Sequence, residues 1–301
     1  MTQPMFTVIT TCLNRGRFIE RTICSVLDQA HDATQYIVVD RGSTDATNEI
    51  IELYQDEMTS LSLPGASRAE AINAGLTEAR GEFILVVDDL LLPAALHAVE
   101  RYLEKRPDAM WLVTSHQRID RDDREVCSIS PQSPVSLSSF LMHDTGLLPL
   151  HASILHRSLI EKHGALDAGL AHAFDYELAC RLLAAGVKPV VSALTLTAVR
   201  EDHPPLPATA TLAQGVEHVT TARRFMRYLP RHEQHALWRN CDKRQRIYAL
   251  AEAELQPVAA QQRLWQQLVQ HPWWIRDRSF RQTLVHGVSH PVPAAATRTA
   301  A

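Results

Sequence analysis

Two adjacent acids, Asp88 and Asp89, are the residues of this sequence that could most directly do chemistry. They follow the apolar run Phe83–Val87, so they come at the end of a predicted buried strand. A carboxylate pair in this place is a natural ligand for Mg²⁺ or Mn²⁺, and such ions usually bridge to substrate phosphates. The alternative is that the pair only ends the strand and caps the next helix. Asp40 ends another apolar run, Tyr36–Val39, although Asp-x-Gly-Ser is also an ordinary turn.

The elements that must position these acids alternate along the first 115 residues. Short, fully apolar runs predict buried strands, and each is followed by a stretch with helical spacing of its apolar residues. This alternation predicts an α/β fold with a mostly parallel sheet and helices on both faces. In such sheets ligands bind beyond the carboxyl ends of the strands, where the acids lie. The predicted strands are Phe6–Thr11, Tyr36–Val39, Phe83–Val87 and Met110–Val113.

The composition changes near residue 205, where Gln, Ala, His and Arg with helical spacing replace the earlier pattern. We therefore predict a catalytic-type domain over 1–205, a helical extension over 206–289 and a disordered tail over 290–301. Residues 116–150 contain several prolines and serines and are expected to form an irregular segment beside a cleft.

Composition excludes several function classes. The 301 residues include 30 Lys and Arg against 34 Asp and Glu, a net charge of −4, which excludes a nucleic-acid binder that depends on bulk positive charge. With 46% hydrophobic residues the chain can bury a core. Its five scattered cysteines predict free thiols. The sequence has no GxxxxGK[ST] or GxGxxG loop, which argues against common ATPase and dinucleotide sites.

The expected location is cytoplasmic, because no signal peptide or long apolar run is seen in the sequence. The segment Trp273–Arg276, with Arg278 and Arg281, has the basic and aromatic character of a peripheral contact with the inner face of a membrane. The alternative is that these residues pack the C-terminal helices together.

Five segments, in the same order and spacing, make the sequence resemble the family 2 glycosyltransferases of the GT-A fold. The segments span residues 5 to about 203 and include the family's opening loop, its Asp-rich turn, the stretch before the metal motif, the metal motif and an acceptor-side block. They are Thr11–Arg15, Tyr36–Asp45, Ala71–Glu82, Asp88–Pro93, and His151–Gly164 with Ala173–Leu182.

The resemblance implies an inverting, metal-dependent transfer of a hexose from a nucleotide-diphosphate sugar to an acceptor hydroxyl. It implies Asp175 as the catalytic base and Mn²⁺ or Mg²⁺ on Asp88, Asp89 and His203. The nucleotide-binding positions that it implies are Thr11, Asn14, Arg15, Asp40, Arg41, Arg68 and Asp88. The acceptor would be a glycan, a lipid-linked molecule or a protein in bacterial-type surface glycan or glycoconjugate synthesis, and a homodimer is left open.

Two departures separate this chain from the family pattern. Arg41 stands where many members have a second acid that contacts the nucleobase, and Val86 replaces the acidic or Asn position two residues before Asp88. Residues Ser67 to Glu70 have the form of a capping box that opens a helix, so Arg68 could also be a solvated residue at that helix start. His203 could also be an ordinary loop histidine. The signature Q-x-x-R-W of processive synthases is absent, which favours single addition.

Two other classes remain as alternatives. The departures at Arg41 and Val86 fit a non-catalytic GT-A-like protein that binds a nucleotide or a partner. A sugar-phosphate nucleotidyltransferase would have a similar sheet, but it is disfavoured because no Gly-rich loop bearing Lys or Arg follows the first strand.

Overall fold

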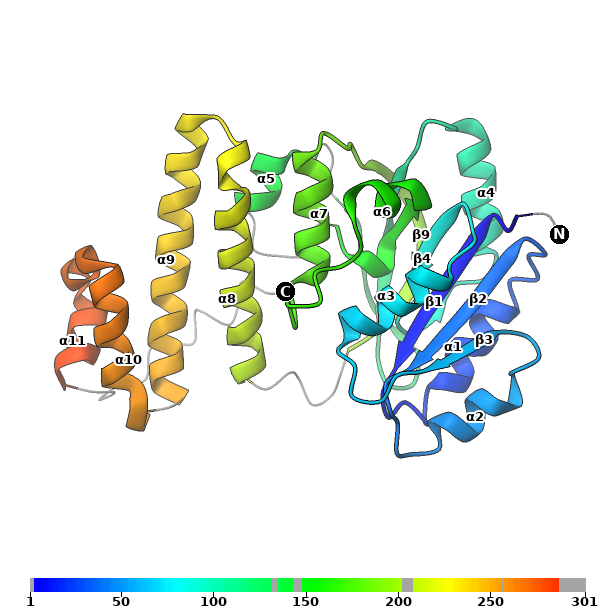
Figure 1. Cartoon of the computed structure of the whole chain (residues 1–301), viewed down its shortest axis with the longest axis horizontal. Helices are drawn as coiled ribbons and strands as arrows, with labels where there is room; N and C mark the ends of the chain where they lie inside the picture. The colour runs from blue at the N-terminus through cyan, green and yellow to red at the C-terminus, as the bar shows by residue number, and fades with distance from the viewer. Residues whose placement is uncertain (1–2, 132–134, 143–147, 202–207, 256, 287–301) are drawn as a thin grey trace. The chain divides into compact units, whose positions relative to one another are not determined.

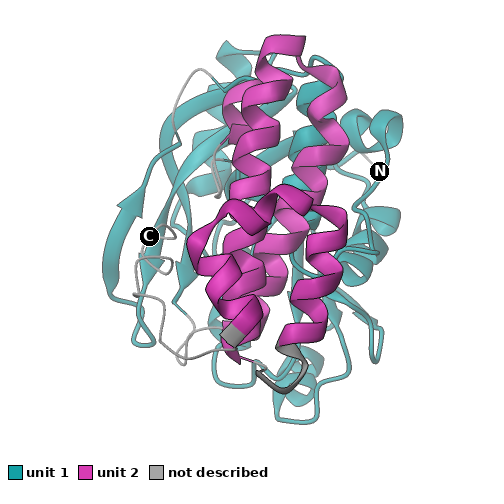
Figure 2. Ribbon diagram, turned by 90° about the vertical axis from the view of Figure 1, so that its left-hand side faces the viewer, with its two compact units in different colours: residues 1–136, 146–205 teal, residues 137–145, 206–301 magenta. Residues whose placement is uncertain are grey.

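A computed structural model describes residues 3–131, 135–142, 148–201, 208–255 and 257–286. The chain forms two compact units, residues 1–136 with 146–205 and residues 137–145 with 206–301, which Figure 2 colours separately. The change near residue 205 therefore coincides with a unit boundary. The sequence division did not anticipate that 137–145 joins the second unit. The expected tail, 290–301, lies outside the described residues.

The first unit contains one mixed sheet with the strand order β3-β2-β1-β4-β8-β6-β9-β5, and β7 pairs with β6 (Figure 1). Its strands are β1 Phe6–Cys12, β2 Thr34–Asp40, β3 Thr59–Ser62, β4 Phe83–Val86, β5 Leu90–Leu91, β6 Trp111–Ile119, β7 Glu125–Ile129, β8 Ser153–His156 and β9 Val190–Arg200. Its helices are α1 Ile19–Leu27, α2 Thr47–Leu53, α3 Arg68–Glu78, α4 Ala95–Lys105, η1 Leu150–Ala152, α6 Arg157–His163 and α7 Phe174–Ala184.

The strands β3, β2, β1 and β4 run parallel, as the sequence predicts for β1, β2 and β4. Cys12 at the end of β1 pairs with Asp40, and Ile9 pairs with Val86 of β4. The loops after β1, β2 and β4 therefore leave the same edge of the sheet, which brings the predicted acids and the loop after β1 together.

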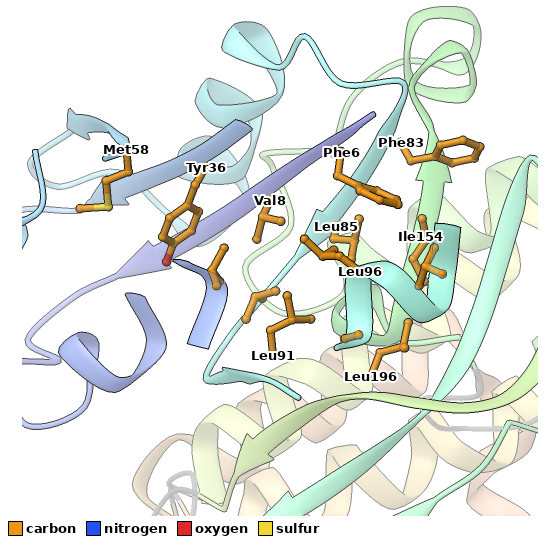
Figure 3. Close-up of a cluster of buried hydrophobic side chains, with 14 of the residues drawn as sticks. Phe6, Val8, Tyr36, Met58, Phe83, Leu85, Leu91, Leu96, Ile154 and Leu196 are labelled. Carbon is orange, nitrogen blue, oxygen red and sulfur yellow. The ribbon is translucent and has the colours of Figure 1, made fainter. Parts of the chain in front are cut away.

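Alternate residues of the central strands enter two different cores. Phe6, Val8 and Tyr36 pack in one cluster with α1 and α4, as Figure 3 shows for part of it. Ile9 and Ile37 point to the opposite face, which α3 and α6 cover. A Cβ at Gly75 of α3 would lie 2.7 Å from a side-chain carbon of Ile9, so this glycine allows the helix to approach the strand closely.

The other half of the sheet differs from the sequence prediction. Residues 116–129 do not form an irregular segment: β6 continues to Ile119 and forms an antiparallel hairpin with β7. Strand β9 pairs in parallel with β6 and in antiparallel fashion with β5. This pairing places Arg200, the last residue of β9, near the segment that contains the paired acids.

The second unit consists of helices: α5 Leu137–Met142, α8 Ala208–Phe225, η2 Met226–Tyr228, α9 Arg231–Leu255, α10 Pro257–Gln270, η3 Pro272–Arg276 and α11 Arg278–His286. Trp274 and Phe280 are fully buried in its own apolar cluster. Both indole N–H groups of Trp273 and Trp274 donate to Asp242, at 3.0 and 2.8 Å. None of the helices in the described ranges is both long and apolar enough to cross a membrane.

Candidate functional site

Hydrogen bonds from side chains and backbone amides join the loop after β1 to the loop after β2. Asn14 has φ of 52° and its Oδ1 accepts the Thr44 backbone N–H at 2.8 Å, while its own N–H donates to Ser43 Oγ at 2.8 Å. The Gly16 N–H donates to Asp45 at 2.9 Å. Asn tolerates positive φ better than other non-glycine residues, so Asn14 suits this turn. The two loops therefore form one surface at the edge of the sheet.

Asp40 is 3% exposed and its carboxylate serves the turn that follows it. It accepts backbone N–H groups of Gly42 and Ser43, each at 3.0 Å, and the Ser43 hydroxyl. The Cys12 thiol lies 3.7 Å from the same carboxylate. The turn thus supplies neutral donors to a buried charge. This is the ordinary-turn geometry that the sequence left open beside a nucleotide-binding role.

Helix α3 begins with the predicted capping box, which places Arg68 at its first position. Ser67 Oγ accepts the Glu70 N–H at 3.2 Å, and the Ser67 N–H donates to Glu70 at 2.7 Å. Arg68 forms an ion pair with Asp88, and its guanidinium lies 5.7 Å from the centre of the Phe174 ring. Arg68 therefore contacts the acid that the sequence prediction assigned to the nucleotide and metal, while part of its side chain stays exposed to solvent.

Asp88 is also close to a histidine that sequence reasoning did not single out. His151 Nδ1 lies 3.6 Å from Asp88 Oδ2, and the His151 ring packs edge-on against His116, with centroids 4.6 Å apart. Burial would raise the pKa of Asp88, but the charge of Arg68, helped by His151 and Arg15, outweighs it and lowers the pKa. Burial lowers the pKa of His151, although the charge of Asp88 opposes this, and burial lowers that of His116 to about 4, so the His116 ring is neutral at pH 7.

Asp89 is held by Arg200. Its Oδ2 accepts the Arg200 backbone N–H and its Oδ1 accepts Nη1, both at 2.9 Å. Arg200 Nε donates to Asp123 at 2.9 Å, and the guanidinium lies 4.5 Å from the centre of the Phe18 ring. The side chains of Arg200 and Asp89 are 2% and 5% exposed. Both carboxylate oxygens of Asp89 are thus used within the protein.

Asp175, the expected catalytic base, lies in the first turn of α7, which begins one residue before it at Phe174. The residue at the N-cap is Ala173, which makes no side-chain cap, so Asp175 is not the N-cap residue. Its Oδ1 accepts the Tyr176 N–H at 2.7 Å. Asp175 lines a small hollow together with apolar residues that include Leu150 and Leu178.

The predicted site residues fall into three groups. Arg68, Asp88 and Asp175 come together with His151, since the charges of both acids act on Arg68 and on His151. Asn14, Arg15, Asp40 and Arg41 lie on the joined loops beside them, and Thr11 precedes them on β1, where it pairs with Val39. His203 lies outside the described residues.

Arg41 is half-buried, and its Nε donates to the Ala66 carbonyl at 2.9 Å. Burial lowers the pKa of Arg41, and the neighbouring positive charge of Arg68 lowers it further. Two guanidiniums are therefore held close enough to repel one another at the start of α3. Such a pair favours an anion beside it.

The residues do not fit a divalent cation in this arrangement. A cation of this kind needs carboxylate oxygens that can turn toward it. Here both oxygens of Asp89 bind Arg200, and Asp88 is paired with Arg68. No group of three His, Cys, Asp or Glu side chains able to hold a metal ion is found within the described part of the chain.

Sequence reasoning missed Asp123 and His116, and it quoted His151 and Arg200 only as parts of motifs. The apolar pattern of residues 188–199 indicates an extended run, and Arg200 directly follows it. That position was the available signal. Nothing in the local pattern of Asp123 indicated its pairing with Arg200.

The chain is similar in sequence to a known family and to several known proteins. Residues 7–164, more than half of the chain, match the family described as Glycosyl transferase family 2. An uncharacterised glycosyltransferase of Rickettsia prowazekii is 25% identical over 185 residues, covering 58% of this chain and 57% of the relative. A putative teichuronic acid biosynthesis glycosyltransferase, TuaG of Bacillus subtilis, is 36% identical over 90 residues, covering 29% of this chain and 36% of TuaG. The chain thus spans little more than half the length of the first relative.

Solved structures agree on the fold. Staphylococcus aureus TarS in complex with UDP-GlcNAc matches 93% of this chain and 81% of that chain, with a TM-score of 0.58 and 16% identity. A mannosyltransferase of Pyrobaculum calidifontis, in complex with GDP-Man and Mn²⁺, matches 94% of this chain and 84% of that chain, with a TM-score of 0.55 and 18% identity. The chain has the α/β GT-A fold and belongs to family 2 of the glycosyl transferases.

Proposed function

We propose that this protein transfers one sugar from a nucleotide-diphosphate sugar to an acceptor hydroxyl with inversion at the anomeric carbon. The observation that carries the proposal is the meeting of Arg68, Asp88 and Asp175 at the edge of the sheet where ligands bind in such folds. The relation to TuaG and the likeness to TarS support a role in bacterial surface glycan or glycoconjugate synthesis. The acceptor would be a glycan, a lipid-linked molecule or a protein.

In the proposed reaction Asp175 takes the proton of the acceptor hydroxyl as its oxygen bonds to the anomeric carbon. The bond between that carbon and the diphosphate oxygen breaks, and its electron pair leaves with the diphosphate. Two observations support this role: Asp175 lies in the first turn of α7, and its charge acts on Arg68 of the Arg68–Asp88 pair. A general base typically contributes about 10²- to 10⁴-fold to a rate.

The expected cofactor, Mn²⁺ or Mg²⁺, has one supporting observation, the Mn²⁺ in the solved mannosyltransferase. The pairing of Asp89 with Arg200 argues against a cation here. The proposed reaction therefore includes no metal ion. The nucleotide-binding residues stay a proposal, in which Asn14 and Asp40 act by shaping the loops and Arg15, Arg41 and Arg68 act by charge.

The test is Asp175→Asn, with release of UDP or GDP from a panel of UDP- and GDP-sugars as the measurement. Water or an added sugar serves as the acceptor. Loss of the base should lower turnover at least about 10²-fold, while affinity for the nucleoside diphosphate stays within about twofold. Asp108→Asn is the matched control, since Asp108 is 74% exposed on the surface. Unchanged turnover in Asp175→Asn would remove Asp175 from the mechanism, and nucleotide binding with no turnover in the wild type would favour the non-catalytic alternative.

A further inference from the structure

The acids at the end of β4 are each paired with an arginine, but the two pairs differ in their access to solvent. The Arg200–Asp89 pair is closed, with both side chains no more than 5% exposed. The Arg68–Asp88 pair is open on one side, with side chains 39% and 19% exposed. A ligand that approaches this edge of the sheet can therefore reach Arg68 and Asp88, but not the oxygens of Asp89.

Arg200 is held in place from several directions. Its guanidinium binds Asp89 and Asp123 and lies over the Phe18 ring, while its backbone N–H also binds Asp89. Asp123 in turn pairs with Arg21. A cation on Asp89 would have to share the carboxylate with this guanidinium or displace it. Displacement would leave a buried positive charge poorly paired, which is costly.

The open side of the site brings several arginines together. Arg41 Nε donates to the Ala66 carbonyl, two residues before Arg68, and the two guanidiniums stand close enough to repel one another. Arg15 acts on both Asp88 and Asp89. Arg68 also lies at the first position of α3, where the partial positive charge of the helix dipole disfavours a cation and favours an anion.

We propose that Arg41 and Arg68, with Arg15, bind and neutralise the donor diphosphate without a divalent cation, and that Asp89 serves as a structural anchor for Arg200. This inference rests on the proposed function and specifies how the same site takes its donor. Guanidiniums suit the task, because their fixed N–H donors match phosphate oxygens in pairs. Electrons balance without a metal: the pair from the broken sugar–oxygen bond stays on the diphosphate, beside Arg68, and Asp175 holds the acceptor proton.

The experiment compares binding of UDP, GDP and uridine to the full chain by calorimetry, in EDTA and in Mn²⁺. The inference predicts that the tighter of the two diphosphates binds within about twofold under both conditions. Arg41→Gln should weaken that diphosphate at least about tenfold in both. Uridine, which lacks phosphate, should bind wild type and variant alike. Arg101→Gln, an exposed arginine on α4, is the matched control and should leave all affinities unchanged.

The outcomes separate this inference from the proposed function. Diphosphate binding that requires Mn²⁺ overturns the inference and leaves the transferase proposal standing. Binding that survives in Arg41→Gln also overturns it. Absence of binding by either diphosphate, with or without Mn²⁺, overturns the proposed function and the inference together. Binding of UDP or GDP to the wild type in EDTA already supports the inference, so the test does not depend on the folding of a variant.

Discussion

Acids lie at the ends of both β2 and β4, but their partners come from different parts of the chain. Asp40 receives two backbone N–H groups and a hydroxyl from Gly42 and Ser43, which follow it closely in the chain. Asp88 and Asp89 receive guanidiniums from Arg68 and Arg200, which lie 20 and 111 positions away in the chain. The loop after β2, or first loop, is therefore a local structure that its own sequence specifies. The loop after β4, or second loop, depends on tertiary structure, and it brings cations to the edge of the sheet.

The largest effect is expected when the closed pair of the second loop is broken. Asp89→Asn should lower the free energy of unfolding by about 3–5 kcal/mol, because it leaves the buried Arg200 without one of its charges. Urea denaturation measures the change. Asp123→Asn is the matched control, since Asp123 binds the same guanidinium but is 23% exposed. It should cost about 1 kcal/mol or less, and equal losses in the two variants would mean that burial does not separate them.

A second prediction concerns how the free energy of unfolding changes with pH. It compares His116 of β6, which packs against His151 beside Asp88, with Asp45 of the first loop. Burial lowers the pKa of His116 to about 4, while the unfolded chain takes up a proton near 6.5. Between these values the unfolded state binds more protons, so stability should fall as the pH is lowered from 6.5 to 4, by no more than about 3 kcal/mol. In the first loop, hydrogen bonds from Thr47 and Gly16 lower the pKa of Asp45, so its contribution is lost only at a pH below the ordinary carboxyl range.

The measurement is the free energy of unfolding at a series of pH values for the wild type and for His116→Phe. The variant should show a shallower decline between pH 6.5 and 4, since it has no ring to protonate there. Parallel curves for the two proteins would contradict this origin of the acid sensitivity.

The smallest expected effect lies in the first loop. Asp40→Asn keeps the shape of the side chain but turns one accepting oxygen into an NH₂ group that faces the N–H donors of Gly42 and Ser43. The cost should be about 1–2 kcal/mol. Thermal or urea unfolding would show it, and a loss as large as that of Asp89→Asn would contradict the distinction between local and distant satisfaction.

The same distinction explains how much the sequence predicted. The strands β1, β2 and β4 were predicted because each is rich in β-branched and apolar residues, and the capping box of α3 was predicted because it is local. Strand β3, Thr59–Ser62, was missed because its residues are largely exposed and carry no apolar pattern. The β6–β7 hairpin was missed for a similar reason, since β7 is exposed throughout.

The candidate site divides in the same way. Asp88 and Asp175 were predicted from the motifs that carry them, and the structure brings them near Arg68. The pairing of Asp89 with Arg200 was not predicted, because no pattern in a single sequence indicates which distant cation will meet a buried carboxylate. That pairing is the observation behind our proposal that arginines, and not a metal ion, bind the diphosphate.

The distance along the chain between Asp89 and Arg200 also has a consequence for how the protein is made. During synthesis β4 and the acids that follow it emerge well before β9. The Asp89 carboxylate can therefore pair with Arg200 only after another 111 residues have been made, and the pair then closes a loop of that length. Contacts of such long range form late and slow folding. A fragment that ended at residue 164, where the family match ends, would contain the acids but not the arginine. We expect such a fragment to fold poorly on its own, although it contains the metal motif.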